Sequence, residues 1–337
     1  MAASRVVAHG NAPQVVRQGT RSRRRRRGVG AAPAAIGLVA LLAGVSTPPA
    51  AATFPGQNRY LACQSARDPG FAEIYRLGVN GGPQVNLTRS PATDQGPAYS
   101  SDGRLLAFHS NRSGNFEIYV KNLDNDTLTN VSSFAAGGEL FPTWSRDSNR
   151  LGFSSNRDGN TEIYVMNSDG TSPARLTDHP AQDALPDWAP DGSVIAFNTN
   201  RDQPVAVPDH PPEAEIYTVD PDTAALTRLT EVPGIDAGAS WSPDGSKIAF
   251  HSNRDGNFEI YVMNADGSGQ TRITENPASD TFASWSPDGK LLSFTSNRDD
   301  AANPDVYVMS AGGGTTTRLT TAPLFDGNCD WQPFIRS

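Results

Sequence analysis

The chain has 337 residues, of which 28 are basic and 36 acidic, and this length suits one large or two ordinary domains. The first 52 residues hold eight of the basic residues and none of the acidic ones, so the remainder carries 20 basic against 36 acidic residues, a net charge of −16. This balance argues against nucleic acid and anionic membranes as partners and favours cations, basic peptides or neutral sugars.

The first segment, residues 1–52, combines an arginine block with the apolar run "GVGAAPAAIGLVALLAGV" and the ending "STPPAAA". A basic start, a short apolar core and an Ala-x-Ala ending predict a secretory signal peptide that is cleaved after Ala52. The protein would then be secreted or periplasmic. An uncleaved membrane anchor is the alternative, and the route of export, general secretory or twin-arginine, stays open. No later segment is apolar enough to span a bilayer.

From residue 59 onward one phrase recurs at a nearly constant interval. It is anchored on an aromatic residue before a turn, with successive anchors 45, 44, 53, 44 and 46 residues apart, at Tyr99, Trp144, Trp188, Trp241, Trp285 and Trp331. Each unit reads as the period-two strand "KIAFHSNR", the turn "RDGN", the aromatic and β-branched strand "FEIYVMN", a second turn and the short strand "TRIT". With the anchor strand, four strands in about 45 residues are typical of a propeller blade.

The two ends of the repeat region are incomplete in complementary ways. Residues 59–88 form a unit that lacks its first strand, and the C-terminal "CDWQP" is a first strand that lacks its unit. Five whole blades and one split blade predict an all-β, six-bladed propeller over residues 53–337, closed by pairing the N- and C-terminal segments. Closure removes the exposed sheet edges that would otherwise promote aggregation.

The only two cysteines fall in the split blade. Aligned on the repeat, Cys63 takes the place of Phe250 and Cys329 that of Ala239, positions that should face each other across a hairpin. We therefore predict a Cys63–Cys329 disulfide, which export would make chemically possible. The alternative is a pair of buried free thiols.

The phrase "WSPDG..IAF.SNRDGN.EIYVMN.DG...RLT" resembles the TolB-type, WD40-like (PD40) propeller repeat, over about residues 59–333. The resemblance implies a six-bladed propeller. TolB itself has a further α/β domain ahead of its propeller, and its propeller face binds an envelope lipoprotein. Related propellers precede a serine peptidase domain, but the sequence contains no G-x-S-x-G motif.

In every unit an arginine precedes the central turn and an acid follows it. The pairs are Arg67/Glu73, Arg112/Glu117, Arg157/Glu162, Arg201/Glu215, Arg254/Glu259 and Arg298/Asp305. We interpret them as ion pairs across each hairpin rather than as a ring of ligands. The Asp-Gly pairs are turn residues, since glycine adopts positive φ, and Ca²⁺ binding in these loops is the alternative.

A second carboxylate lies five residues before each anchor aromatic. These residues are Asp94, Glu139, Asp183, Asp236, Asp280 and Asp326. They should lie where one blade leads into the next, at the mouth of the central channel, and they have no basic neighbour in sequence. We expect a focused negative potential that binds a cationic group or a divalent cation such as Ca²⁺. The alternative is loop capping of backbone N–H groups.

One blade carries an insertion, "DQPVAVPDHPPEA" at residues 202–214, where another blade has only "DGNF". We expect this loop to overhang the carboxylate mouth and to contribute to binding through Pro208, Asp209, His210 and Glu213. A tolerated surface insertion is the alternative.

Catalytic motifs are sparse, and we assign no catalytic residue and no firm cofactor. His109 and His251 occupy equivalent positions in opposite blades and are interpreted as packing residues, and no linear metal or phosphate motif occurs. The sequence therefore predicts a monomeric, non-catalytic propeller of the cell envelope that binds a protein or a cationic peptide or serves as a scaffold. The alternative is a metal-dependent hydrolase or lyase acting on an extracellular substrate.

Overall fold

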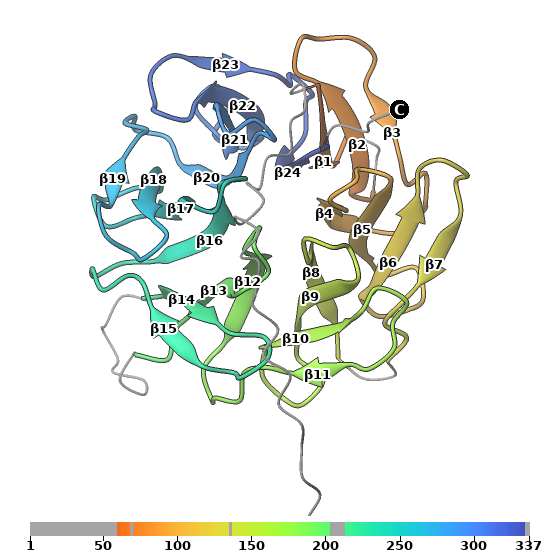
Figure 1. Cartoon of the computed structure of the whole chain (residues 1–337). Helices are drawn as coiled ribbons and strands as arrows, with labels where there is room; N and C mark the ends of the chain where they lie inside the picture. The colour runs from red at the N-terminus through yellow and green to blue at the C-terminus, as the bar shows by residue number, and fades with distance from the viewer. Residues whose placement is uncertain (1–58, 68–69, 135–136, 203–212, 334–337) are drawn as a thin grey trace, which may run out of the picture. The chain divides into compact units, whose positions relative to one another are not determined.

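A computed structural model describes residues 59–67, 70–134, 137–202 and 213–333. Within these residues the chain forms six four-stranded antiparallel sheets, here called blades I to VI, arranged around a common centre (Figure 1). The described residues contain no helix long and apolar enough to cross a membrane. The expected six-bladed, all-β propeller is confirmed.

Each blade runs outward from an innermost strand. Blade I consists of β24 (Asp326–Trp331), β1 (Tyr60–Ser65), β2 (Glu73–Gly78) and β3 (Val85–Asn86). Blade II consists of β4 (Asp94–Tyr99), β5 (Leu105–Ser110), β6 (Glu117–Asn122) and β7 (Leu128–Asn130). Blade III consists of β8 (Glu139–Trp144), β9 (Arg150–Ser155), β10 (Glu162–Asn167) and β11 (Ala174–Arg175).

The second half of the ring has the same arrangement. Blade IV consists of β12 (Asp183–Trp188), β13 (Ile195–Thr199), β14 (Glu215–Val219) and β15 (Leu226–Arg228). Blade V consists of β16 (Asp236–Trp241), β17 (Lys247–Ser252), β18 (Glu259–Asn264) and β19 (Thr271–Arg272). Blade VI consists of β20 (Asp280–Trp285), β21 (Leu291–Ser296), β22 (Asp305–Ser310) and β23 (Thr316–Arg318).

The core lies between and within the blades and repeats one aromatic pair. In blades II to VI the second strand supplies a buried phenylalanine, such as Phe250, whose ring packs against a tyrosine of the third strand, such as Tyr261. In blade I the same position holds Cys63, opposite Tyr75. A smaller side chain there leaves room for a covalent link in place of an aromatic ring.

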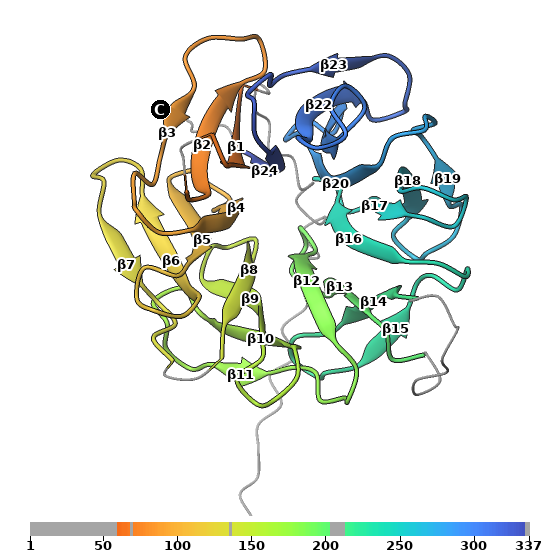
Figure 2. The same cartoon turned by 180° about the vertical axis from the view of Figure 1, so that it is seen from behind.

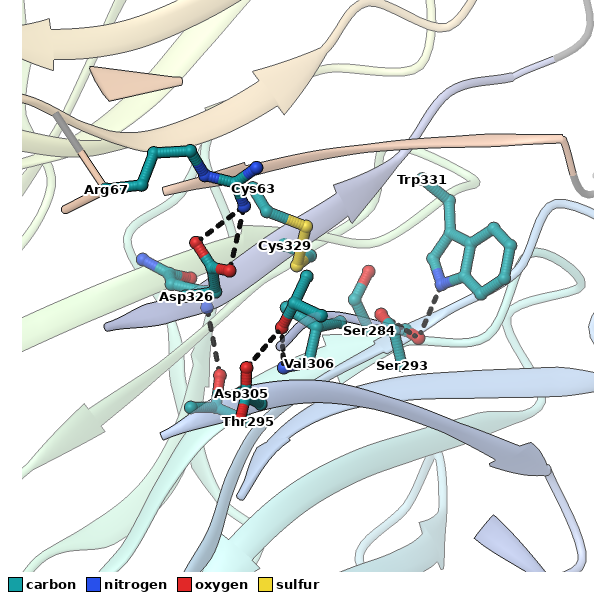
Figure 3. Close-up of a disulfide and its surroundings, with 12 residues drawn as sticks. Cys63, Arg67, Ser284, Ser293, Thr295, Asp305, Val306, Asp326, Cys329 and Trp331 are labelled. Carbon is teal, nitrogen blue, oxygen red and sulfur yellow. Dashed lines mark hydrogen bonds and ion pairs between the residues drawn. A yellow bond between two sulfur atoms is a disulfide. The ribbon is translucent and has the colours of Figure 1, made fainter. Parts of the chain in front are cut away.

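Blade I is closed by the two ends of the repeat region. β24 pairs with β1, and Cys63 lies directly opposite Cys329 in the register. The two cysteines form a disulfide (Figure 3). The predicted Cys63–Cys329 bond is thus confirmed, and the alternative of two free thiols is wrong.

Every innermost strand is irregular three residues before its anchor aromatic. The pairing register shifts there, and the backbone adopts positive φ at Gly96, Phe141, Leu185, Gly238, Phe282 and Asn328. A bulge of this kind turns the next side chains toward a new direction. Here it aims the second half of each innermost strand at the centre of the ring.

Candidate functional site

The six carboxylates expected at the channel mouth are completely buried. Each forms an ion pair with the arginine that follows the second strand of its own blade. The pairs are Asp94–Arg112, Glu139–Arg157, Asp183–Arg201, Asp236–Arg254, Asp280–Arg298 and Asp326–Arg67, at 2.5–3.1 Å. Figure 3 shows the Arg67 guanidinium directed at the Asp326 carboxylate. These carboxylates have no basic neighbour in sequence, but the fold brings an arginine to each of them.

The register of the sheet explains the pairing. Asp94 lies opposite Ser110, so Arg112, two residues further on, folds back over the carboxylate while its Nε donates to Ser110 Oγ at 2.8 Å. The same guanidinium lies over the Tyr119 ring, 4.9 Å from its centroid. The sequence predicts Glu117 as the partner of Arg112, but the strand pairing brings Asp94, 18 residues earlier in the chain, to the guanidinium.

The acids that follow the central turn have different partners. Glu162 accepts hydrogen bonds from Arg175 Nη2 at 2.8 Å and from Thr177 Oγ1 at 2.6 Å, and Glu215 accepts from Arg228 and Thr230 in the same way. These groups tie the third strand to the outermost strand. The predicted cross-hairpin Arg/Glu pairs are therefore replaced by two separate sets of contacts in each blade.

The insertion of blade IV is largely outside the described residues. Pro208, Asp209 and His210 fall in the segment that is not described, and Glu213 is half-buried just before β14. The binding role of this loop stays a prediction.

The two repeated histidines are buried packing residues. His109 lies between the rings of Phe116 and Phe141, and its Nδ1 accepts the Phe141 N–H at 3.2 Å. Burial lowers the pKa of His109 to about 3 and that of His251 to about 4, so both rings are neutral at physiological pH. This arrangement agrees with the packing interpretation.

The site that sequence reasoning missed is the central channel itself. A cavity of about 250 Å³ is lined by residues of all six innermost strands, from the bulge to the turn after the anchor aromatic. Pro190, Pro243, Pro287 and Pro333 line it beyond the aromatic residues, together with Arg146. Its walls are polar and apolar in about equal measure, which suits a ligand that combines an apolar body with polar or charged groups.

Two acidic residues stand out in this channel. Asp187 on β12 and Asp330 on β24 each directly precede an anchor tryptophan, where the other blades have Ala98, Thr143, Ser240 and Ser284. In the ring of innermost strands β12 and β24 are three blades apart in either direction, so the two carboxylates come from opposite walls (Figure 1 and Figure 2). Comparing the residue before each anchor aromatic would have found them.

Both aspartates are surrounded by protein but partly open to the cavity. Asp187 Oδ2 accepts the Trp241 N–H at 2.7 Å, and Asp330 Oδ2 accepts the Tyr99 N–H at 2.7 Å. Burial raises the pKa of each carboxyl to about 7, and the charge of Asp330 adds to the shift at Asp187. Near neutral pH the pair can therefore exchange a proton or accept a cation.

Within the described residues, no three His, Cys, Asp or Glu side chains gather into a group that could hold a metal ion. Asp187 and Asp330 are two side chains, fewer than such a group requires. Each of the six buried carboxylates before the anchor aromatics is neutralised by an arginine.

Comparison with known proteins identifies the repeat. The model of the TolB beta propeller domain family (PD40) matches residues 117–208 and 213–335. A Protein TolB homolog of Chlorobium luteolum is 32% identical over 191 residues, covering 56% of this chain but only 30% of that protein. The chain thus spans less than a third of the length of this relative.

Solved structures share the fold. The crystal structure of TolB from Acinetobacter baumannii superposes with a TM-score of 0.70 at 21% identity, covering 82% of this chain and 67% of that chain. A candidate TolB from Agrobacterium tumefaciens gives a TM-score of 0.61 at 24% identity, covering 82% of this chain and all of that chain.

Proposed function

Since the chain belongs to the TolB β-propeller domain family, we propose that it is a non-catalytic binding or scaffold module of the cell envelope that holds a cationic segment of a protein or peptide in its central channel. The observation that carries this proposal is the placement of Asp187 and Asp330 on opposite walls of the channel. Neither forms an ion pair with any residue that the structure describes. The proposal moves the binding charge from the channel mouth to the channel interior.

The chemistry of the walls supports a side chain with an apolar stem and a cationic end. Proline and tryptophan side chains can contact methylene groups, while two carboxylates in surroundings of low dielectric attract a positive charge more strongly than they would in water. A bound cation would also shift both carboxyl groups to their ionised form, because an opposite charge lowers a carboxyl pKa.

We also propose that the protein is exported and acts as a monomer. Residues 1–52 would be the cleaved signal peptide and residues 53–337 the propeller. The Cys63–Cys329 bond supports an oxidising compartment, since structural disulfides are rare in the cytosol.

The test is a calorimetric titration of the protein with the basic peptide acetyl-Gly-Lys-Gly-Lys-Gly amide at low ionic strength. We expect the double change Asp187→Asn and Asp330→Asn to weaken binding at least tenfold, because Asn keeps the acceptor for the backbone N–H but removes the charge. The matched control changes Asp169→Asn and Asp300→Asn, two exposed turn residues, and so removes the same two negative charges. Equal affinities for wild type and the channel variant, or an equal loss in the control, would overturn the proposal.

A further inference from the structure

A second cavity lies between blades IV and V, on the face that carries the turns after the anchor tryptophans. We call it the IV/V wedge. It has a volume of about 340 Å³, and its lining includes Asp191, Val194, Thr218, Trp241 and Asp266. The lining comes from the β12–β13, β16–β17 and β18–β19 turns and from the blade IV strands β14 and β15.

The equivalent place between blades III and IV is filled by the chain itself. The Arg150 guanidinium lies over the Trp188 ring at 4.9 Å from its centroid. Its Nη1 forms an ion pair with Asp222 Oδ1 at 3.4 Å, across the boundary between the two blades. Trp188 is consequently only 4% exposed.

The register shows which residues correspond. Leu151 pairs with Trp144, and Ile195 pairs with Trp188. Arg150, which precedes Leu151, and Val194, which precedes Ile195, therefore have the same place in their blades. The equivalent of Trp188 in the next blade is Trp241. The two acids correspond as well: Asp222 lies three residues after Val219, and Asp266 lies three residues after Met263. Val219 and Met263 are equivalent because each pairs with the second-strand residue that lies opposite the anchor tryptophan. The IV/V wedge therefore keeps the tryptophan and the carboxylate but has valine where the arginine would be.

Trp241 differs from the other anchor tryptophans in its hydrogen bonding. Trp241 is partly exposed, and its indole N–H has no acceptor among the described residues. The indole N–H groups of Trp144, Trp285 and Trp331 instead donate to a carbonyl of the preceding blade. Thr218 also presents a polar group to the wedge, where four of the other five blades have a valine, namely Val120, Val165, Val262 and Val308.

The charge of the wedge is negative. Asp191 and Asp266 are exposed, and neither forms an ion pair within the part of the chain that the structure describes. Hydrogen bonds from Ser268, and then the charge of Lys247, lower the pKa of Asp266 and keep it ionised at neutral pH. Lys247 itself donates to Asn264 Oδ1 at 2.6 Å.

We propose that the IV/V wedge is a docking site for the guanidinium of an arginine side chain presented by a partner polypeptide. The aromatic face of Trp241 and the carboxylate of Asp266 repeat the surroundings that Trp188 and Asp222 provide for Arg150. Arginine fits better than lysine because its planar group can stack on an indole and still present a fork of N–H donors to a carboxylate. The site goes beyond the proposed function, since it lies outside the channel aspartates.

The first test follows the five tryptophan indole N–H resonances of ¹⁵N-labelled protein during titration with acetyl-Gly-Arg-Gly amide. We expect the Trp241 resonance to shift, with at least tenfold weaker binding of the same peptide carrying citrulline, which keeps the shape but not the charge. A response to citrulline equal to that to arginine, or tighter binding of D-glucose as a neutral probe, would overturn the proposal.

Two variants exchange the wedges. Val194→Arg should fill the IV/V wedge as Arg150 fills its own, and should weaken arginine-peptide binding at least tenfold. Arg150→Val should open the III/IV wedge, so that the Trp188 resonance also responds and the number of wedge sites for arginine rises from one to two. An Arg150→Val protein whose Trp188 resonance does not respond, or a Val194→Arg protein that binds as wild type does, would contradict the assignment.

The channel variant Asp187→Asn with Asp330→Asn should bind the arginine peptide in the wedge as wild type does, which separates the two proposals.

Discussion

At the scale of single residues, the enclosed carboxylates of this propeller differ in whether an opposite charge compensates the cost of their burial. Asp94 and its five equivalents are buried but paired with arginine, which compensates the cost of removing a charge from water. Asp187 and Asp330 are enclosed without such a partner. The unpaired carboxylates are therefore the ones whose ionisation the fold disfavours.

This difference predicts a pH dependence for Asp187. Its pKa is raised from 3.8 to about 7 in the folded protein, so its contribution to stability is fully present below about pH 4 and is lost as the pH rises to about 7. Asp187→Asn should therefore raise the free energy of unfolding at pH 8, by about 1–3 kcal/mol after allowance for the open side of the cavity, and much less at pH 4. Urea unfolding at the two pH values measures the difference.

Asp244 provides the control with the opposite sign. Desolvation acts to raise the pKa of this exposed carboxylate, but hydrogen bonds from Ser242 and Ser246 outweigh it and lower the pKa. Its stabilising contribution is present above the unfolded pKa and is lost as the pH falls, so Asp244→Asn should destabilise the protein at pH 8. If both variants change stability in the same direction at pH 8, the account of Asp187 does not hold.

At the scale of elements, the bulge of the innermost strand determines what reaches the channel. At Gly96 the backbone has φ of +60°, and an added Cβ would lie 2.8 Å from the His109 ring. The bulge and the buried histidine thus depend on each other in blade II, and Gly238 and His251 repeat this arrangement in blade V.

We predict that Gly96→Ala lowers the free energy of unfolding by about 2 kcal/mol, because it adds backbone strain to a steric clash. Thermal or urea unfolding of the variant measures the loss. In a protein that already carries His109→Ala, Gly96→Ala should lower the free energy of unfolding by less than it does in the wild type, because the clash with the histidine ring is gone. Strictly additive losses would mean that the histidine is not the obstacle.

At the scale of the whole molecule, the ring is held closed in blade I by strand pairing and one covalent bond between residues 266 positions apart. Replacing both cysteines by serine should lower the free energy of unfolding by about 2–5 kcal/mol, since the disulfide restricts a long loop in the unfolded chain. Urea unfolding compares the variant with the oxidised protein. Hydrogen exchange should show β24 and β1 opening first, and uniform exchange across the six blades would contradict this.

The sequence by itself determined the architecture. Alternating strands and recurring turns are local signals, and their repetition defined the blade, the number of blades, the split closure and the cysteine pair. Each of these follows from residues close in sequence or from counting repeats, so no tertiary contact had to be known.

Only the tertiary structure decided the chemistry of the sites. Arg67 meets Asp326 across 259 positions, and Asp187 and Asp330 come together from opposite walls. The wedge at Trp241 is open because Val194, in the neighbouring blade, is small. Ion pairing, burial and cavities depend on which side chains converge from different blades, and a one-dimensional repeat contains the positions of these residues but not their partners.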